Sequence, residues 1–416
     1  MKIALAQQNY HIGNFEKNTG KIIEAIEAAK RQKADLVVFS ELSVCGYPPR
    51  DLLEFTGFTD KCYEALHTIK QHADTIGVLL GSPARNPVKE GKDLFNAAFL
   101  LYEKEIKAEV HKTLLPTYDV FDEYRHFEPA FEWNIVPFKG KKLAVTICED
   151  IWNVEDNPMY RISPMDKLMA FGPDIMINLS ASPFDYVHEK EREMIAQKNV
   201  LLYNLPLIYC NATGSQTEIV FDGASMVFDK EGKCCSRLPS FEEAVETITV
   251  TDEGYILPGD KTAVGDPDYT DTSADTKADT LVSKGPVAKS FADTSGDAKG
   301  GRPDLFNPSL NIGGIHRALV TGISDYFSKM NFSRAILGSS GGVDSAVALA
   351  LACQALGREN VRAVLMPSPF SSSHSVDDAV ELSNNLGNPF DIIKIGPVFD
   401  STLSVLKPVF GDLPFG

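Results

Sequence analysis

Three residues in the first 150 positions have the types needed to cleave an amide: Glu41, Lys112 and Cys148. Each follows an apolar run typical of a β-strand, since LVVFSE ends on Glu41, AEVHK on Lys112 and LAVTIC on Cys148. Because strand ends direct side chains into shared crevices, we expect the three to converge. In such a site a cysteine thiolate attacks the carbonyl carbon, a carboxylate takes the thiol proton, and an ammonium group stabilises the oxyanion.

Taken singly, each residue has a more ordinary interpretation. A carboxylate after a strand is usually a solvated loop residue, an unpaired cysteine usually packs, and a lone lysine carries little information. The sequence around all three is more specific. FSELSVCGYPPRDLL, HKTLLPTYDVFDEYRHFEP and AVTICEDIWN resemble, in this order, the signature blocks of the nitrilase superfamily, and more narrowly the glutaminase domain of glutamine-dependent NAD synthetases. The resemblance implies an αββα sandwich with Glu41 as general base, Lys112 as transition-state stabiliser and Cys148 as the nucleophile that forms a glutamyl thioester.

The same resemblance implies contacts to the glutamine substrate. Tyr118 and Ser182 match two family contacts, with local loop hydrogen bonding as the alternative interpretation. The family usually has a lysine six residues after the serine, where this sequence has His188, so the third contact is either His188 or Lys190. Glu149, beside the nucleophile, either binds the substrate ammonium group or caps the following turn.

A second candidate site is the glycine- and serine-rich loop in ILGSSGGVDSAVALALA. It lies between an apolar strand and an alanine-rich helix, where small residues let backbone N–H groups approach a phosphate and the helix N-terminus favours negative charge. The loop has neither the ending of a Walker motif nor the spacing of a dinucleotide fingerprint. The alternative is an ordinary tight loop with Asp344 as the helix N-cap.

The run SGGVDS resembles the PP-loop of N-type ATP pyrophosphatases, and this resemblance implies an ATP site. The residues assigned to that site are Gly338, Ser339, Ser340, Gly341, Gly342, Val343, Asp344 and Ser345. Asp344 is also the implied ligand of Mg²⁺, because one carboxylate together with phosphate oxygens is a normal set of magnesium ligands. Downstream, MPSPFSSSHSVDDA resembles the segment that follows this loop in NAD synthetases, and we expect its serines to cap a helix beginning near Ser375.

The elements that must position these residues alternate in a way typical of α/β proteins. The expected strands before residue 257 are Lys2–Gln7, Leu36–Phe39, Gly77–Leu80, Ala97–Tyr102, Leu143–Ile147, Asp174–Asn178, Leu207–Asn211 and Ser225–Phe228. The expected helices are Asn14–Lys33, Thr59–Ala73 and Glu189–Leu202. Many of the strands are continuous apolar runs, which indicates that both faces of the sheet are covered.

A change in composition divides the chain into three segments. Residues 1–257 form the expected glutaminase domain, and residues 258–303, rich in Asp, Thr, Ser, Lys and Gly, are expected to be a flexible linker. Residues 304–416 show a β-loop-α-β-α-β order, which predicts the start of a doubly wound parallel sheet with its ligand at the strand C-termini. Because about 110 residues are too few for a complete domain of this type, we expect the synthetase half to be incomplete here.

Composition excludes several other classes of protein. The formal net charge is -17, which argues against an extended nucleic-acid surface. No run approaches the roughly 20 apolar residues needed to span a membrane. The seven cysteines are an odd number without CxxC spacing, which favours neither a zinc site nor a disulfide framework and indicates a reducing cytoplasm.

A nitrilase-type glutaminase ahead of a PP-loop resembles glutamine-dependent NAD synthetases as a whole. The resemblance implies that glutamine hydrolysis supplies ammonia to AMP-activated deamido-NAD, with ATP and Mg²⁺ as co-substrate and cofactor, in a homo-oligomer. One alternative is a stand-alone amidase or carbamoylase with a vestigial nucleotide-binding segment. Another is a non-catalytic nucleotide-binding regulator.

Overall fold

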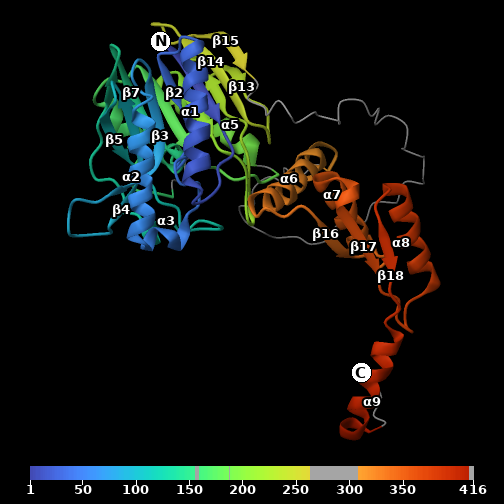
Figure 1. Ribbon diagram of the computed structural model, residues 1–416. Coiled ribbons are helices and arrows are strands. Elements are labelled where there is room, and N and C mark those ends of the chain that lie inside the picture. Colours follow the sequence, from blue (N-terminus) through green and yellow to red (C-terminus); the bar gives the residue numbers. More distant parts are fainter. Residues whose placement is uncertain (155–158, 187, 263–307, 412–416) are drawn as a thin grey trace, which may run out of the picture.

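The first part of the chain folds into two β-sheets packed face to face, with helices on both outer sides (Figure 1). The computed structural model describes residues 1–154, 159–186, 188–262 and 308–411. In spatial order, the seven-stranded sheet comprises β15 (Ile256–Thr262), β14 (Ala244–Val250), β1 (Lys2–Gln7), β2 (Leu36–Val38), β3 (Gly77–Arg85), β4 (Leu94–Tyr102) and β5 (Glu105–His111). The six-stranded sheet comprises β13 (Cys234–Arg237), β12 (Met226–Phe228), β9 (Leu207–Asn211), β8 (Ile175–Ser180), β7 (Lys141–Ile147) and β6 (Val136–Phe138).

Three apolar layers hold the sandwich together. Helices α1 (Phe15–Arg31) and α2 (Thr56–Lys70) cover the seven-stranded sheet, and α4 (Pro164–Met169) and α5 (His188–Tyr203) cover the other. A third cluster fills the space between the sheets. Strand β1 shows how one sequence serves two layers: alternate residues face opposite sides, so Ile3 and Leu5 enter the inter-sheet core while Ala4 and Ala6 face the helices. The expected αββα sandwich is confirmed.

A small hairpin extends from this sandwich. Its strands, β10 (Thr213–Gln216) and β11 (Ile219–Asp222), pair in antiparallel fashion apart from the two large sheets. Helix α6 (Pro308–Lys329) packs against the hairpin and leads into the C-terminal region (Figure 1). The hairpin was not expected from the sequence, because its polar residues interrupt the apolar pattern that marks the other strands.

The C-terminal region contains a three-stranded parallel sheet of β16 (Ala335–Gly338), β17 (Val361–Leu365) and β18 (Phe390–Ile392). Helices α7 (Val343–Leu356) and α8 (Ser373–Leu386) alternate with the strands, and α9 (Gly396–Phe410) follows. This confirms the expected strand–helix order. Among the described helices, none combines the length and apolar composition that crossing a bilayer requires.

The expected linker overlaps a strand. Residues 258–262 of the segment expected to be flexible belong to β15, which pairs with β14 at the edge of the seven-stranded sheet. The strand ends later than composition indicates, because ladder hydrogen bonds from a neighbouring strand can hold polar residues. The rest of the expected linker, residues 263–303, lies outside the described residues.

Candidate active site

Glu41, Lys112 and Cys148 stand at strand ends contributed by both sheets. Glu41 lies three residues past β2, and Lys112 directly follows β5, both in the seven-stranded sheet. Cys148 directly follows β7 in the six-stranded sheet. All three are buried, with exposed fractions of 1%, 0% and 5%. The packing of one sheet on the other is therefore what gathers residues that are far apart in sequence.

Lys112 is held by two carboxylates. Its Nζ lies 2.8 Å from Glu41 Oε1 and 2.7 Å from Glu123 Oε1. Asn96 Nδ2 donates to Glu41 Oε1 at 2.6 Å, and the Tyr47 hydroxyl donates to Glu123 Oε1 at 2.7 Å. Every carboxylate in this cluster thus has a fixed orientation, which is what a proton acceptor at a reacting centre requires.

The electrostatics of the cluster follow from its burial. Burial alone would lower the pKa of Lys112, but the carboxylates of Glu123 and Glu41 outweigh it and hold that pKa well above its ordinary value. Burial raises the pKa of Glu123 against the opposing effect of Lys112. Lys112 is therefore a permanent cation next to the site.

Sequence reasoning missed Glu123. Its segment, YDVFDEYRHFEP, was recognised as a signature block, but nothing in the spacing separated Glu123 from the acidic residues around it, Asp119, Asp122 and Glu128. Only the fold selects it, because the short helix α3 (Glu123–His126) turns this side chain inward while its neighbours face outward.

The Cys148 thiol occupies a strained and buried position. Its backbone has φ +43°, in the left-handed region that non-glycine residues rarely adopt. Burial and the Glu41 carboxylate raise the thiol pKa well above its ordinary value, and the Lys112 ammonium opposes them. The resting thiol is consequently neutral, so attack on a substrate requires a base to remove its proton.

A cavity of about 440 Å³ opens beside Cys148. It is lined by Tyr118, Asp119, Val120, Phe121, Cys148, Glu149, Trp152, Ser182, Pro183, Phe184, Asp185, His188, Glu191, Glu218, Ile219 and Val220. The residues expected to bind glutamine, namely Tyr118, Ser182 and His188, are therefore brought together around the nucleophile. Lys190, the alternative to His188, is exposed and does not line this cavity.

Glu149 forms a polar cluster with two tyrosines on one side of the cavity. The Tyr118 hydroxyl lies 2.9 Å and 3.0 Å from its two carboxylate oxygens, and the Tyr160 hydroxyl lies 3.0 Å from Oε1. Burial raises the pKa of Glu149. An acidic group of this kind, set in a cavity and oriented by two hydroxyls, can accept hydrogen bonds from a cationic ligand.

Ser182, which also lines the cavity, is held by Asn211. Its backbone N–H donates to Asn211 Oδ1 at 2.9 Å, and Asn211 Nδ2 returns a bond to Ser182 O at 3.2 Å. His188 stacks on Trp152 with ring centroids 4.8 Å apart. Burial lowers the pKa of His188. The histidine therefore presents a mainly neutral imidazole to the cavity.

The glycine- and serine-rich loop links β16 to α7. Gly342, and not Asp344, is the N-cap of α7, so the alternative interpretation of Asp344 as the cap is wrong. The Ser345 hydroxyl accepts from Ser340 N at 3.2 Å and donates to Gly342 O at 2.9 Å, which closes the loop on itself. Asp344 lies exposed in the first turn of the helix.

A cavity of about 240 Å³ lies beside this loop. Gly338, Ser339 and Ser340 form one side, and Ser371 and Ser375 contribute to the other. Among the described residues, the buried Ser339 hydroxyl has no hydrogen-bond partner. Across the cavity, the Ser372 side chain caps α8 by accepting from Ser375 N at 3.1 Å, as the serine cluster predicts. The loop before α7 and the first turn of α8 thus line one small cavity, and an N-terminal helix turn of this kind is suited to phosphate.

Comparisons with known proteins identify the family of this chain. The carbon-nitrogen hydrolase family model matches residues 2–254, and the NAD synthase model matches residues 315–410. The chain is 36% identical to the glutamine-dependent NAD(+) synthetase of Synechocystis sp., covering 100% of this chain and 68% of that protein. It is also 36% identical to the enzyme of the same name from Thermotoga maritima, covering 99% and 68%. The chain therefore spans about two thirds of these relatives.

Solved structures give the same result. The glutamine-dependent NAD(+) synthetase of Acinetobacter baumannii in complex with ADP superposes with a TM-score of 0.80 at 29% identity, covering 100% of this chain and 68% of that one. An amidase of Nesterenkonia AN1 from the nitrilase superfamily matches 62% of this chain with a TM-score of 0.52 at 21% identity, a likeness of fold alone. The chain belongs to the family of glutamine-dependent NAD(+) synthetases, with a carbon-nitrogen hydrolase domain followed by an NAD synthase segment.

Proposed function

We propose that Cys148, Glu41 and Lys112 hydrolyse glutamine in the cavity beside Cys148. Glu41 takes the thiol proton as Sγ attacks the side-chain amide carbon, and the Lys112 ammonium stabilises the oxyanion of the tetrahedral intermediate. The proton passes to the leaving nitrogen, which departs as ammonia and leaves a glutamyl thioester on Cys148. Water, deprotonated by Glu41, then attacks the thioester, so glutamate is released and the thiol is restored.

In substrate binding, we assign the two charged groups of glutamine to different residues of the cavity lining. Glu149, oriented by Tyr118 and Tyr160, binds the α-ammonium group, in keeping with its acidic character. Ser182 and His188, which line the same cavity, receive the α-carboxylate. Of these, the His188 assignment has the support of cavity lining, which Lys190 lacks.

We assign ATP to the loop Gly338–Ser345. There the backbone N–H groups at the start of α7 and the hydroxyls of Ser339 and Ser340 hold the phosphates. The carboxylate of deamido-NAD attacks the α-phosphorus of ATP, which releases pyrophosphate and gives an acyl adenylate. Ammonia then displaces AMP, so that the amide of NAD forms. The exposed Asp344 carboxylate would hold Mg²⁺, which neutralises phosphate charge when bound.

Two further proposals concern the setting of the reaction. The seven cysteines are free thiols in the structure, which supports a reducing cytoplasm. Exposed apolar side chains on α9, among them Val405, Val409 and Phe410, support assembly into a homo-oligomer. Light scattering of the purified chain tests the assembly, and a strictly monomeric mass at micromolar concentration contradicts it.

The observation that carries the glutaminase assignment is the buried Lys112–Glu41 contact next to a neutral thiol that opens into a cavity. The test is ammonia release from glutamine, compared with release from small aliphatic amides. We expect a preference for glutamine that Cys148→Ala abolishes. An equal or higher rate on simple amides contradicts the substrate assignment and favours a general amidase.

A further inference from the structure

Helix α6 belongs by sequence to one half of the molecule and packs on the other. Most of it falls in the segment that the NAD synthase model matches, residues 315–410, yet it rests on the β10–β11 hairpin of the glutaminase domain (Figure 1). Near its C-terminal end, Asp325 Oδ2 accepts hydrogen bonds from Ser215 N at 2.5 Å and from Asn9 Nδ2 at 2.7 Å. This carboxylate thus ties the helix to the first strand of the hairpin.

Lys329, one turn further along α6, completes this attachment. Its Nζ donates to Ser215 O at 2.5 Å, to Tyr10 O at 2.8 Å and to Asn9 Oδ1 at 2.6 Å. The side chain is only 10% exposed and lies 3.5 Å from the Asp325 carboxylate. Both the N–H and the C=O of Ser215 are therefore bonded to charged groups of α6, which fixes this residue more firmly than neutral hydrogen bonds would.

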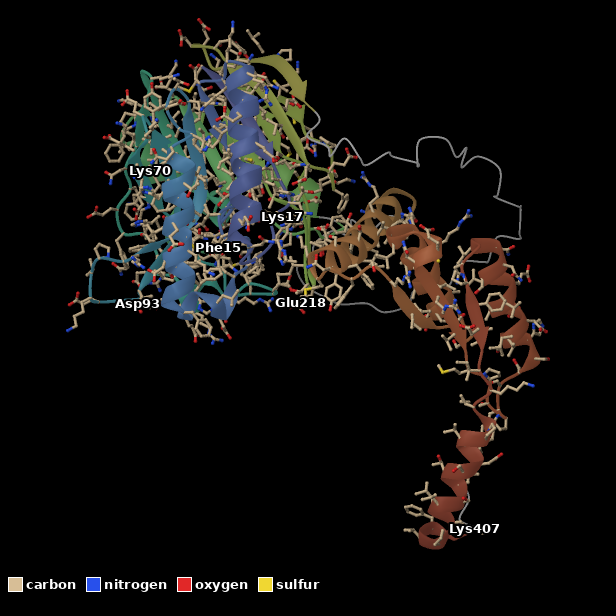
Figure 2. The ribbon with its side chains drawn as sticks, in the orientation of Figure 1. Phe15, Lys17, Lys70, Asp93, Glu218 and Lys407 are labelled. Carbon is tan, nitrogen blue, oxygen red and sulfur yellow. The ribbon has the colours of Figure 1, made fainter. Side chains whose placement is uncertain are left out.

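The hairpin held in this way also forms a wall of the glutaminase cavity. Ser215 is paired directly with Val220 across the hairpin, and Val220 O accepts from Phe184 N at 2.7 Å. Phe184, Glu218 and Val220 line the cavity beside Cys148, and the same three line a second cavity of about 500 Å³ against α6. Figure 2 places Glu218 at this junction. These three residues are therefore common to both cavities.

Two glycines of α6 let the helix approach this wall from behind. A methyl group on Gly314 would lie 3.7 Å from Phe184 Cε2, and one on Gly322 would lie 3.5 Å from Val220 Cγ2. These are ordinary van der Waals distances for a single methyl, and a longer side chain at Gly322 would reach past that methyl toward Val220 and the adjoining cavity. Helix α6 therefore lies against two residues that also line the glutaminase cavity.

The second strand of the hairpin reaches the substrate side of the cavity through a buried ion pair. Asp222, the last residue of β11, pairs with Arg192 of α5. Arg192 Nη1 in turn donates to Ser182 O at 3.3 Å and to Pro183 O at 3.5 Å. Any shift of the hairpin is thus transmitted to the Ser182 loop, because a fully buried pair cannot lengthen without leaving charge unpaired.

From these contacts we infer that α6 positions the glutamine-binding wall of the glutaminase cavity, with Asp325 and Lys329 as positioning residues that act through Ser215 and Val220. The inference rests on the proposed glutaminase function. It assigns to this helix of the synthase segment a part in glutamine affinity, while the proton transfers remain with Glu41, Lys112 and Cys148. Coupling of this kind travels through packed and hydrogen-bonded residues, as here.

The test compares glutamine KM and kcat for ammonia release in the full chain. Lys329→Met removes the ammonium group that donates to Ser215 O. Gly322→Leu adds a side chain next to Val220, the residue that pairs with Ser215. We expect each to raise KM roughly 3- to 30-fold, since residues along such networks change coupling by that factor. We expect kcat to change less than about 2-fold, because the reacting groups are untouched. A merely structural role would lower the active fraction, and hence kcat, without moving KM.

Two other substitutions serve as controls. Lys17→Met makes the same charge change at an exposed lysine of α1 (labelled in Figure 2), and Gly314→Ala adds a methyl that the packing accommodates. Neither should move KM. An unchanged KM in Lys329→Met and Gly322→Leu overturns the inference, and so does a loss confined to kcat. Cys148→Ala tests the glutaminase assignment separately from the role of α6, because retention of ammonia release in that variant refutes the glutaminase assignment itself.

If Lys329→Met or Gly322→Leu misfolds, hydrogen exchange tests the role of α6 without either variant. Hydrogen exchange is followed in the Cys148→Ala chain with and without saturating glutamine, which that chain binds without turning it over. We expect glutamine to slow exchange in peptides covering the hairpin, residues 213–222, and also in those covering the second half of α6. Protection of the hairpin without any change in α6 overturns the proposed role of the helix.

Discussion

The two candidate sites of this protein differ most in their exposure to water. Glu41, Lys112 and Cys148 are buried at the ends of strands from two packed sheets, where the carboxylates of Glu41 and Glu123 balance the charge of Lys112. The loop around Ser340 and Gly342 lies exposed at the end of a three-stranded sheet. Acid–base chemistry at a thiol depends on charges that water would screen, whereas phosphate is held by backbone N–H groups whose direction is set by the loop itself.

The difference in exposure to water predicts which substitutions each site tolerates. In the buried cluster, the removal of one charge leaves another uncompensated, so chemistry and stability change together. In the exposed loop, the decisive property is backbone shape, and a single added methyl group matters more than a lost charge. Four experiments distinguish the sites on this basis.

The largest expected effect is at the nucleophile. Cys148→Ala should lower glutamine hydrolysis on the order of 10⁵-fold, because no other group can form the thioester. ATP binding at the loop should stay unchanged, as measured by calorimetric titration. Cys235→Ala, a change at a partly exposed thiol outside the cavity, is the control and should retain full activity. A parallel loss of ATP binding in Cys148→Ala would show that the two sites are not independent.

A smaller effect is expected at the base. Glu41→Gln keeps the shape of the side chain and, through its amide oxygen, the bonds from Lys112 and Asn96, but it loses the bond from Ala181 N and the proton acceptor, so kcat should fall about 10²- to 10⁴-fold. Lys112 retains its bond to Glu123 in this variant, which limits the cost in stability. The measurement is kcat together with the thermal midpoint. A rate within a few-fold of wild type would remove Glu41 from the mechanism.

The exposed loop should respond to shape. Gly341 has φ +81°, and an alanine methyl there would lie 2.1 Å from the backbone oxygen of Ser375. We expect Gly341→Ala to weaken ATP binding roughly 10- to 100-fold through backbone strain and displacement of α8. Gly342→Ala is the matched control, because its nearest atom is Ser340 Oγ at 3.5 Å and its φ is negative. Equal affinities in the two variants would contradict a shape-determined site.

The smallest expected effect is a change in ultraviolet absorbance when the Cys148 thiol loses its proton. Because burial and Glu41 raise the pKa of Cys148, thiolate absorbance should be absent near neutral pH and appear only above the ordinary thiol pKa of about 8.5. The sign follows from the shift, since a raised pKa retains the proton to higher pH. The measurement is the difference in ultraviolet absorbance between wild type and Cys148→Ser along a pH titration. A thiolate signal at pH 6 would mean a preformed ion pair with Lys112 instead.

Many helices and strands of the glutaminase domain could be predicted from the local pattern of apolar residues. The strand Leu207–Asn211 coincides with β9 as predicted, and the bounds of α1 differ from the prediction by a residue or two. Such segments are strongly periodic or continuously apolar, so their own residues decide their structure. The β10–β11 hairpin escaped prediction because its first strand is polar, and its contacts with α6 and Arg192 come from residues far from it in sequence.

The sequence by itself determined which residue types were available for chemistry and roughly where each strand would deliver them. It placed Glu41, Lys112 and Cys148 at strand ends, because apolar runs and the residues that follow them are local features. Only the tertiary structure decided that Glu123 joins Lys112 while Asp122 beside it does not, and that α6 rests against the wall of the cavity. Those choices depend on which surfaces meet when two sheets and a distant helix pack, and burial of that kind has no signature in the neighbouring residues.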